Sequence, residues 1–128
     1  LRIAERLSAD ASWPARFVRD FLRGRPAEQV ERIADEYIEQ NVRVNRDPES
    51  SYLDGALLAL CGLHEKALDL IGRAIRGGYC AYPNLETDPL LESIRGRPEY
   101  RSLVAEGQRA QQAFIEYLRD SGMHQASA

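Results

Sequence analysis

The residues with the clearest chemical potential are His64 and Glu65, which open an expected helix after Gly62. A His-Glu pair could serve as a metal ligand or a general base, but a zinc-binding helix needs a second histidine four residues after the first. Position 68 is Leu, so His64 is expected to be a packing residue near a turn. His124, in a tail of Gln, Ala and Ser, is an equally weak candidate. We therefore expect no bound metal and no other cofactor.

Two cysteines, Cys61 and Cys80, are the next candidates, because a thiolate is a nucleophile. Cys61 lies at the C-terminal end of an expected helix, whereas a reactive thiolate is favoured by a helix N-terminus or a cationic neighbour. Inert packing is the better interpretation for Cys61. Cys80 lies in an expected loop from Tyr79 to Pro83. A disulfide between the two is not expected, and the low cysteine content favours the reducing cytoplasm.

The sequence contains no serine nucleophile motif and no pair of catalytic carboxylates with a fixed partner, so we expect no catalytic activity from this chain. Gly77-Gly78 lacks the Lys-Ser/Thr of a phosphate-binding loop and is interpreted as a helix stop. The net charge is -3, so an overall positive charge cannot drive binding to nucleic acid. No apolar run reaches the roughly 20 residues that span a bilayer. Direct nucleic-acid binding, which would be a salt-sensitive interaction, and membrane binding are both disfavoured.

Charge is distributed unevenly along the chain. Residues 1–25 carry six Arg against three acids, whereas residues 26–54 carry three Arg against eight acids. Four of these acids recur at helical spacing, in an acidic stripe of Glu28, Glu31, Asp35 and Glu39. The stripe is either a docking surface for a basic partner or a solvated face with i,i+4 pairs to Arg32 and Arg43. A second cluster, Arg95, Arg97 and Arg101, lies among acidic residues and is expected to form an ion-paired surface.

The elements that position these residues are predicted to be helices only, because apolar residues follow helical spacing and no sustained strand-like alternation occurs. Asp47-Pro48 and Asp88-Pro89 each predict a helix start, with an N-cap carboxylate before a proline. Glycines predict the stops. The expected helices span 2–9, 13–23, 26–44, 48–61, 64–76, 89–95 and 98–120.

A repeat is indicated by the turn glycines, since Gly62 and Gly96 are 34 residues apart and Gly24 and Gly62 are 38 apart. With Gly62 at the turn, residues 48–81 resemble one tetratricopeptide repeat. The match places small residues at the helix crossing and larger apolar residues on the seam between the helices, namely Gly55, Ala67 and Ala74, with Leu58 and Ile71. The sequence departs from the repeat pattern at Ser51, Asp54 and Tyr79, where Trp, Leu and Pro are usual.

The flanking segments fit the repeat more loosely. Residues 10–47 are expected to form a unit before it, and residues 82–120 a degenerate unit after it. Cys80-Ala81-Tyr82-Pro83, Thr87-Asp88-Pro89-Leu90 and Pro98-Glu99-Tyr100 resemble the tetratricopeptide-containing C-terminal regions of bacterial signalling proteins. Winged-helix transcriptional regulators and eukaryotic-like serine/threonine kinases are examples. Because the chain opens on Leu1 and its only methionine is Met123, we expect it to be part of a longer protein. A kinase, winged-helix or cyclase domain upstream of Leu1 would set its biological context.

The expected fold is therefore one all-α domain over residues 1–122, with antiparallel helix pairs stacked as a short right-handed superhelix, a long C-terminal capping helix, and a disordered tail at 123–128. The resemblance implies a non-catalytic interaction or regulatory module that binds a protein or peptide in its concave groove. First helices line that groove in such solenoids. The groove candidates are Val18, Phe21, Leu22, Tyr52, Ala56, Ala59, Leu60 and Tyr82. The alternative is a small-molecule sensor with a closed pocket between helix pairs.

The final helix is also the expected self-association surface. Tyr100, Leu103, Val104, Ala110 and Phe114 are predicted to face inward and to cap the last seam. Beyond Gly107 the apolar pattern is wider than one seam can bury, so part of it must stay exposed or meet a neighbour. The self-association candidates are Phe114, Ile115 and Leu118, and a weak homodimer is expected.

Overall fold

The computed structural model describes residues 13–42, 47–79 and 82–123, and its regular elements over these ranges are all helical. This confirms the all-α class for the described residues. The α-helices are α2 (Trp13–Leu22), α3 (Ala27–Tyr37), α4 (Pro48–Leu60), α5 (His64–Arg76), α6 (Tyr82–Thr87), α7 (Glu92–Arg95) and α8 (Pro98–Leu118). A 3-10 turn, Pro89–Leu91, precedes α7, and π-helical turns extend α3 over Ile38–Val42 and α8 over Arg119–Met123.

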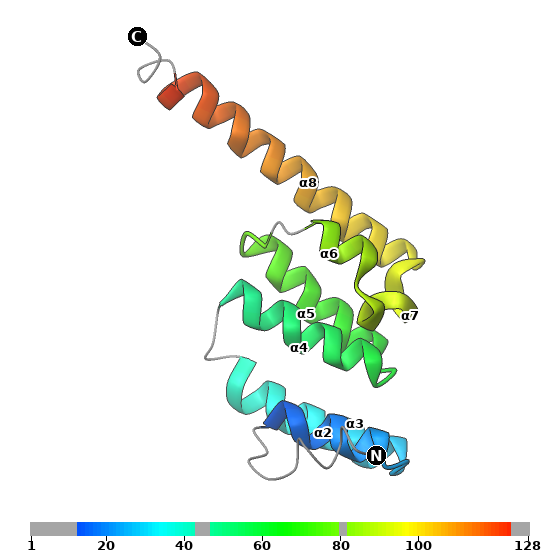
Figure 1. Ribbon diagram of the computed structural model, residues 1–128. Helices are drawn as coiled ribbons and strands as arrows, with labels where there is room; N and C mark the ends of the chain where they lie inside the picture. Colours follow the sequence, from blue (N-terminus) through cyan, green and yellow to red (C-terminus); the bar gives the residue numbers. More distant parts are fainter. Residues whose placement is uncertain (1–12, 43–46, 80–81, 124–128) are drawn as a thin grey trace.

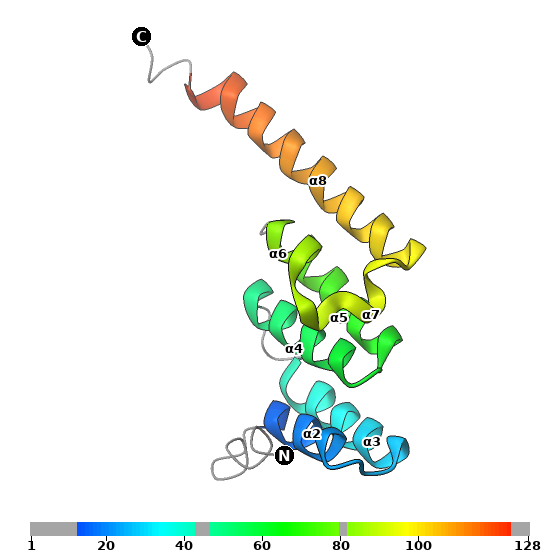
Figure 2. The same ribbon diagram turned by 45° about the vertical axis from the view of Figure 1, so that its right-hand side comes forward.

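The helices are arranged as successive layers (Figure 1). The α2 and α3 helices pack on each other, as do α4 and α5, and α2 also contacts α4. The short α7 contacts α4, α5, α6 and α8. The first half of α8 packs on α5, and its second half projects past the rest of the molecule in both views (Figures 1 and 2).

Two aspartates begin helical segments as predicted. The side chain of Asp47 accepts a hydrogen bond from the backbone N–H of Glu49 at 3.4 Å, and that of Asp88 accepts from Leu90 N–H at 3.0 Å. In both cases a proline follows, where its fixed φ suits the first helical position and its missing N–H costs nothing. The local sequence therefore determines where α4 and the Pro89–Leu91 turn begin.

Small residues allow α4 and α5 to approach closely. A Cβ built on Gly55 would stand 2.9 Å from Ile71 Cδ1 and 3.2 Å from the Ile71 backbone nitrogen. Ala67 and Ala74 of α5 are also fully buried. Gly62 connects the two helices with φ of +78°, a conformation that L side chains rarely adopt. The crossing predicted around Gly55 is confirmed.

The buried apolar residues form one cluster that runs from α2 to α8, with Phe17, Leu58, Ile71, Leu85 and Tyr100 fully buried. Two polar links join residues of this cluster to neighbouring segments, one buried and one part-buried. Tyr37 at the end of α3 donates to Oδ2 of Asp54 on α4 at 2.7 Å. Tyr52 on α4 donates to Oδ2 of Asp88 at 2.5 Å. The Asp88 carboxylate therefore binds Tyr52 and also caps the Pro89–Leu91 turn. These bonds join adjacent layers of the molecule.

The α6 helix was expected to be loop, and this expectation is wrong. Pro83 is the second residue of α6, where it leaves no intrahelical hydrogen bond unmade, and the α6 residue Leu85 is fully buried. The hydroxyl of Tyr100 donates to the Leu85 carbonyl at 2.6 Å, and Arg95 Nε donates to the same oxygen at 3.4 Å. Tertiary contacts therefore stabilise a helix that its own six residues would not.

Several expectations concern residues that the structure does not describe. They are the helix over 2–9, the loop cysteine Cys80, the pair of Glu39 with Arg43, and His124. The expected tail falls partly inside the described range, since Met123 ends a helical turn. Residues 124–128 lie outside that range.

Candidate functional site

The predicted concave groove is largely closed. Val18, Tyr52, Ala56 and Ala59 belong to the hydrophobic core rather than to an accessible surface. The reason is that α4 is covered by α2 on one side and by the Pro89–Leu91 turn and α7 on the other. A peptide lying along α4 would have to displace these segments, so these four groove assignments are corrected to core positions.

The other groove candidates do remain at the surface. Phe21 and Leu60 are each 37% exposed, and Leu22 and Tyr82 are half-buried. Phe21 and Leu22 lie on α2, Leu60 ends α4 and Tyr82 begins α6. They come from different layers.

Tyr52 has a clear structural role in place of the predicted contact role. Its ring stacks on that of Tyr79, with centroids 4.4 Å apart and planes within 11° of parallel. Burial, followed by the hydrogen bond and charge of Asp88, raises the pKa of Tyr52 far above its ordinary value. The phenol therefore stays protonated and donates to Asp88.

The main exposed apolar surface is the second half of α8. Tyr100 is fully buried and Val104 nearly so, but beyond Gly107 the helix leaves the body, and Phe114 is 60%, Ile115 39%, Tyr117 66% and Leu118 42% exposed. Ala110 and Phe114 lie on the side of α8 that was predicted to face inward, but they are exposed, so the prediction that they cap the last seam is wrong. The second half of α8 projects past the other helices, so nothing in the described part of the chain covers this region. We call Phe114, Ile115, Tyr117 and Leu118 the α8 apolar surface.

A hollow of about 520 Å³ adjoins the α8 apolar surface. Its walls come from the end of α5, the start of α6 and the inner side of α8. At its base the helices touch, because a Cβ on Gly107 would overlap Ile75 Cγ2 and stand 2.7 Å from the Tyr82 hydroxyl oxygen. The side chains around it are mainly apolar or aromatic and include Ile75, Tyr79, Tyr82, Phe114, Ile115 and Leu118. This arrangement suits binding of an apolar surface.

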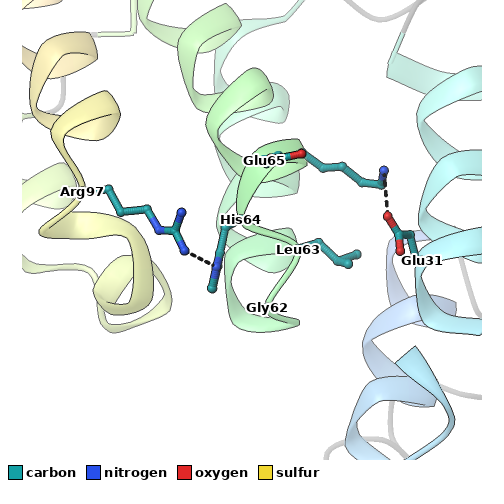
Figure 3. A pocket seen from close by; sticks show the side chains of 7 residues that line it. Glu31, Gly62, Leu63, His64, Glu65 and Arg97 are labelled. Carbon is teal, nitrogen blue, oxygen red and sulfur yellow. Dashed lines mark hydrogen bonds and ion pairs between the residues drawn. The ribbon is translucent and has the colours of Figure 1, made fainter. Parts of the chain in front are cut away.

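His64 lies at a second hollow, of about 350 Å³, between the starts of α5 and α8 and the side of α3. Figure 3 shows Arg97 reaching across to the His64 ring. An Arg97 guanidinium nitrogen lies 2.7 Å from His64 Nδ1, and because a guanidinium can only donate, Nδ1 is the acceptor of this hydrogen bond. His64 thus helps to attach the start of α8 to α5. Glu65, the next residue of α5, also lines this hollow (Figure 3).

The same region accounts for part of the acidic stripe. Lys66 Nζ lies 3.3 Å from Glu31 and 2.9 Å from Asp35, so two of the four stripe carboxylates bind a lysine of α5. The hydrogen bond to Asp35 is the main reason that the pKa of Lys66 is raised. Half of the stripe therefore connects the first helix pair to the second. No sequence spacing indicated this contact, because Lys66 and Asp35 lie on different pairs.

Cys61 is not activated as a nucleophile. Cys61 is a buried free thiol, and burial raises its pKa to about 12, so little thiolate forms at neutral pH. The described residues contain no group of three or more His, Cys, Asp or Glu side chains that could hold a metal ion. Over the same ranges, no helix combines the length and apolar character required to cross a membrane.

The arginines around Gly96 are held by local partners. Arg101 pairs with Glu86 at 3.1 Å, and Arg95 donates to the carbonyls of Leu85 and Asp88. Arg76, on the helix before them, pairs with Glu106 at 3.3 Å. The expected ion-paired surface is thus found at Arg101, whereas Arg95 binds backbone carbonyls and Arg97 binds His64.

Comparison of the chain with protein-family models, with curated proteins and with solved structures finds no match. The functional argument consequently depends on the surfaces described above.

Proposed function

We propose that this chain is a non-catalytic helical interaction module that binds a helix of a protein partner along the α8 apolar surface. The observation that carries the proposal is the continuity of one apolar stripe along α8. Its first part packs on α5 through Leu103, Val104 and Gly107, and its second part continues uncovered through Phe114, Ile115 and Leu118.

The shape of this surface favours a helix as the bound element. Apolar residues at spacings of three and four form a seam for another helix, and α5 already occupies the first part of that seam. A helix laid beside α8 beyond the end of α5 would continue the layers and contact Tyr79 and Tyr82 at the hollow. A second copy of the chain can supply such a helix with its own α8, which is the expected weak homodimer.

The wider context is part of the same proposal. We infer a tetratricopeptide-like stack, supported by the Gly55–Ile71 crossing, the Gly62 turn and the paired packing of α2 with α3 and of α4 with α5. In that arrangement the chain would be the C-terminal part of a bacterial signalling or transcription-regulatory protein. The buried free thiol of Cys61 is compatible with a cytoplasmic location.

A small-molecule sensor is the competing function, and the hollow of about 520 Å³ is large enough for a ligand. However, Phe114 on its wall is 60% exposed, so the hollow opens onto the α8 apolar surface. A closed pocket would instead bury most of its ligand. The open form supports a protein partner.

Two measurements test the proposal without knowledge of the partner. Sedimentation of the full chain at increasing concentration should show weak dimerisation. A labelled peptide of residues 98–118, used as an amphipathic helix probe, should bind the chain. The double variant Ile115→Glu/Leu118→Glu should lose both properties, because it places charges in the seam.

The matched control is Gln108→Glu/Gln112→Glu, which adds the same charge at exposed positions of α8 outside the seam. This control should dimerise and bind the probe like the wild type. A wild type that stays monomeric and ignores the probe would overturn the proposal. If the double variant failed to fold, as judged by circular dichroism, Ile115 and Leu118 would belong to the core and the surface assignment would be wrong.

A further inference from the structure

A basin lined by arginines lies between α2 and α3, with a volume of about 690 Å³. It lies on the first helix pair, at the opposite end of the molecule from the projecting end of α8 (Figures 1 and 2). Five arginines and two acidic residues surround it, so its net charge is strongly positive although the whole chain carries -3. The basin residues are Arg16, Arg19, Asp20, Arg23, Arg25, Gln29, Arg32, Ile33 and Glu36.

One of the two acids is already engaged inside the protein. The Asp20 side chain is 8% exposed, and its Oδ1 lies 3.5 Å from Arg19 Nε. Its Oδ2 accepts a hydrogen bond from Gln29 Nε2 at 3.0 Å. Asp20 therefore joins α2 to α3 and balances Arg19, which leaves Glu36 as the second carboxylate among the lining residues.

Three of the arginines are available to a ligand. Arg23, Arg25 and Arg32 are exposed, and within the described ranges none of them has an acidic partner. Like charges that converge on one hollow repel each other, and an anion placed between them would relieve this repulsion. Guanidinium groups also offer paired N–H donors that match the two oxygens of a carboxylate.

We propose that this basin binds a carboxylate-rich segment of a protein. The lining residues contain no aromatic ring, so bases of a single-stranded nucleic acid would have nothing to stack on. The acidic residues Glu28, Glu31 and Asp35 lie on the same α3 helix and would repel a continuous phosphate backbone that extended past the basin. A short acidic segment meets neither obstacle. The inference is independent of the helix-binding proposal, because it concerns the other end of the molecule.

The test uses a fluorescein-labelled oligoglutamate peptide and measures its anisotropy with the full chain at low salt. The wild type should bind the peptide, and high salt should release it. In the variant Arg23→Gln/Arg25→Gln/Arg32→Gln, the loss of three exposed ion pairs should weaken binding by about tenfold.

The matched control is Arg73→Gln/Arg109→Gln/Arg119→Gln, which changes the net charge equally at exposed sites outside the basin. This control should weaken binding clearly less than the basin variant does, because its three charges lie outside the basin and act on the peptide only through the long-range field. Circular dichroism checks that each variant folds, and the single change Arg32→Glu replaces the triple variant if it does not.

Three results would overturn the inference. The first is absence of oligoglutamate binding at low salt. The second is equal weakening by the basin variant and the control, which would indicate a general charge effect. The third is tighter binding of oligouridylate than of oligoglutamate with the same charge, lost in the basin variant, which would assign the basin to single-stranded nucleic acid.

Discussion

Replacing Tyr37 by Phe should destabilise the protein by about 1–3 kcal/mol, because it removes the donor from a buried carboxylate. The Tyr37 hydroxyl donates to Asp54 Oδ2 at 2.7 Å, and both side chains lie in the core between α3 and α4. The ring itself packs on Phe17, with centroids 6.0 Å apart, and Phe preserves that contact. The loss therefore reports the hydrogen bond rather than a change of packing.

The size of the effect should depend on pH in a defined direction. Burial raises the pKa of Asp54 above its ordinary value, and the Tyr37 hydrogen bond partly opposes that rise. Above the folded-state pKa the carboxylate is charged, and its burial costs stability. As the pH falls through the folded-state pKa towards the unfolded value of about 3.9, the folded state takes up the proton first and this cost is relieved. Tyr37→Phe should therefore destabilise most at neutral pH and less in acid.

Urea unfolding followed by circular dichroism, at neutral pH and near pH 4.5, measures these differences. A double-mutant cycle with Asp54→Leu isolates the pair. In the Asp54→Leu background the change at Tyr37 should cost less than about 0.5 kcal/mol, because no buried carboxylate then loses a partner. Tyr117→Phe, at a 66% exposed ring, is the matched control and should be neutral.

Two outcomes would refute this reasoning. An equal cost of Tyr37→Phe in both backgrounds would mean that its hydroxyl does not act through Asp54. A cost that grew on acidification would mean that the carboxylate is not the group whose charge is stabilised.

Two further predictions concern the glycine contacts. Gly55→Leu should destabilise by about 3 kcal/mol, because Ile71 leaves no room for the side chain, whereas Gly96→Leu, with no atom within 4 Å of the added Cβ, should have little effect on the thermal midpoint. Gly107→Ala should weaken the packing of α8, because the added methyl group would overlap Ile75 and the Tyr82 hydroxyl. Amide hydrogen exchange over Pro98–Leu118 should then be faster than in the wild type, and unchanged exchange would contradict the close contact.

Sequence reasoning located the helices where local chemistry defines them. The aspartate-proline starts at Asp47 and Asp88 and the turn at Gly62 are fixed by interactions within a few residues, so they could be predicted. The α6 helix could not, because contacts of Leu85 with Arg95 and Tyr100 hold it. Such contacts depend on the tertiary arrangement rather than on local propensity.

The candidate surfaces were predicted unevenly for the same reason. The exposed end of α8 could be predicted from the sequence of that helix alone, because Phe114, Ile115 and Leu118 cover more of its circumference than one seam can bury. The groove along α4 was misassigned because the covering segment, 89–95, is too short for its position to be inferred from periodicity. Gly107 was the available signal for the hollow, since a glycine inside a helix often marks a close contact.

Buried polar groups explain why the layers take one relative position. Purely apolar seams would allow neighbouring helix pairs to shift, whereas a buried hydrogen bond is lost when its partners move. The bond from Tyr37 to Asp54 fixes the first pair on the second, and the bond from Tyr52 to Asp88 fixes the second on the segment that leads to α8. Asp54 is also a position where the sequence departs from the repeat pattern that it resembles. We therefore expect this departure to fix how α3 lies on α4.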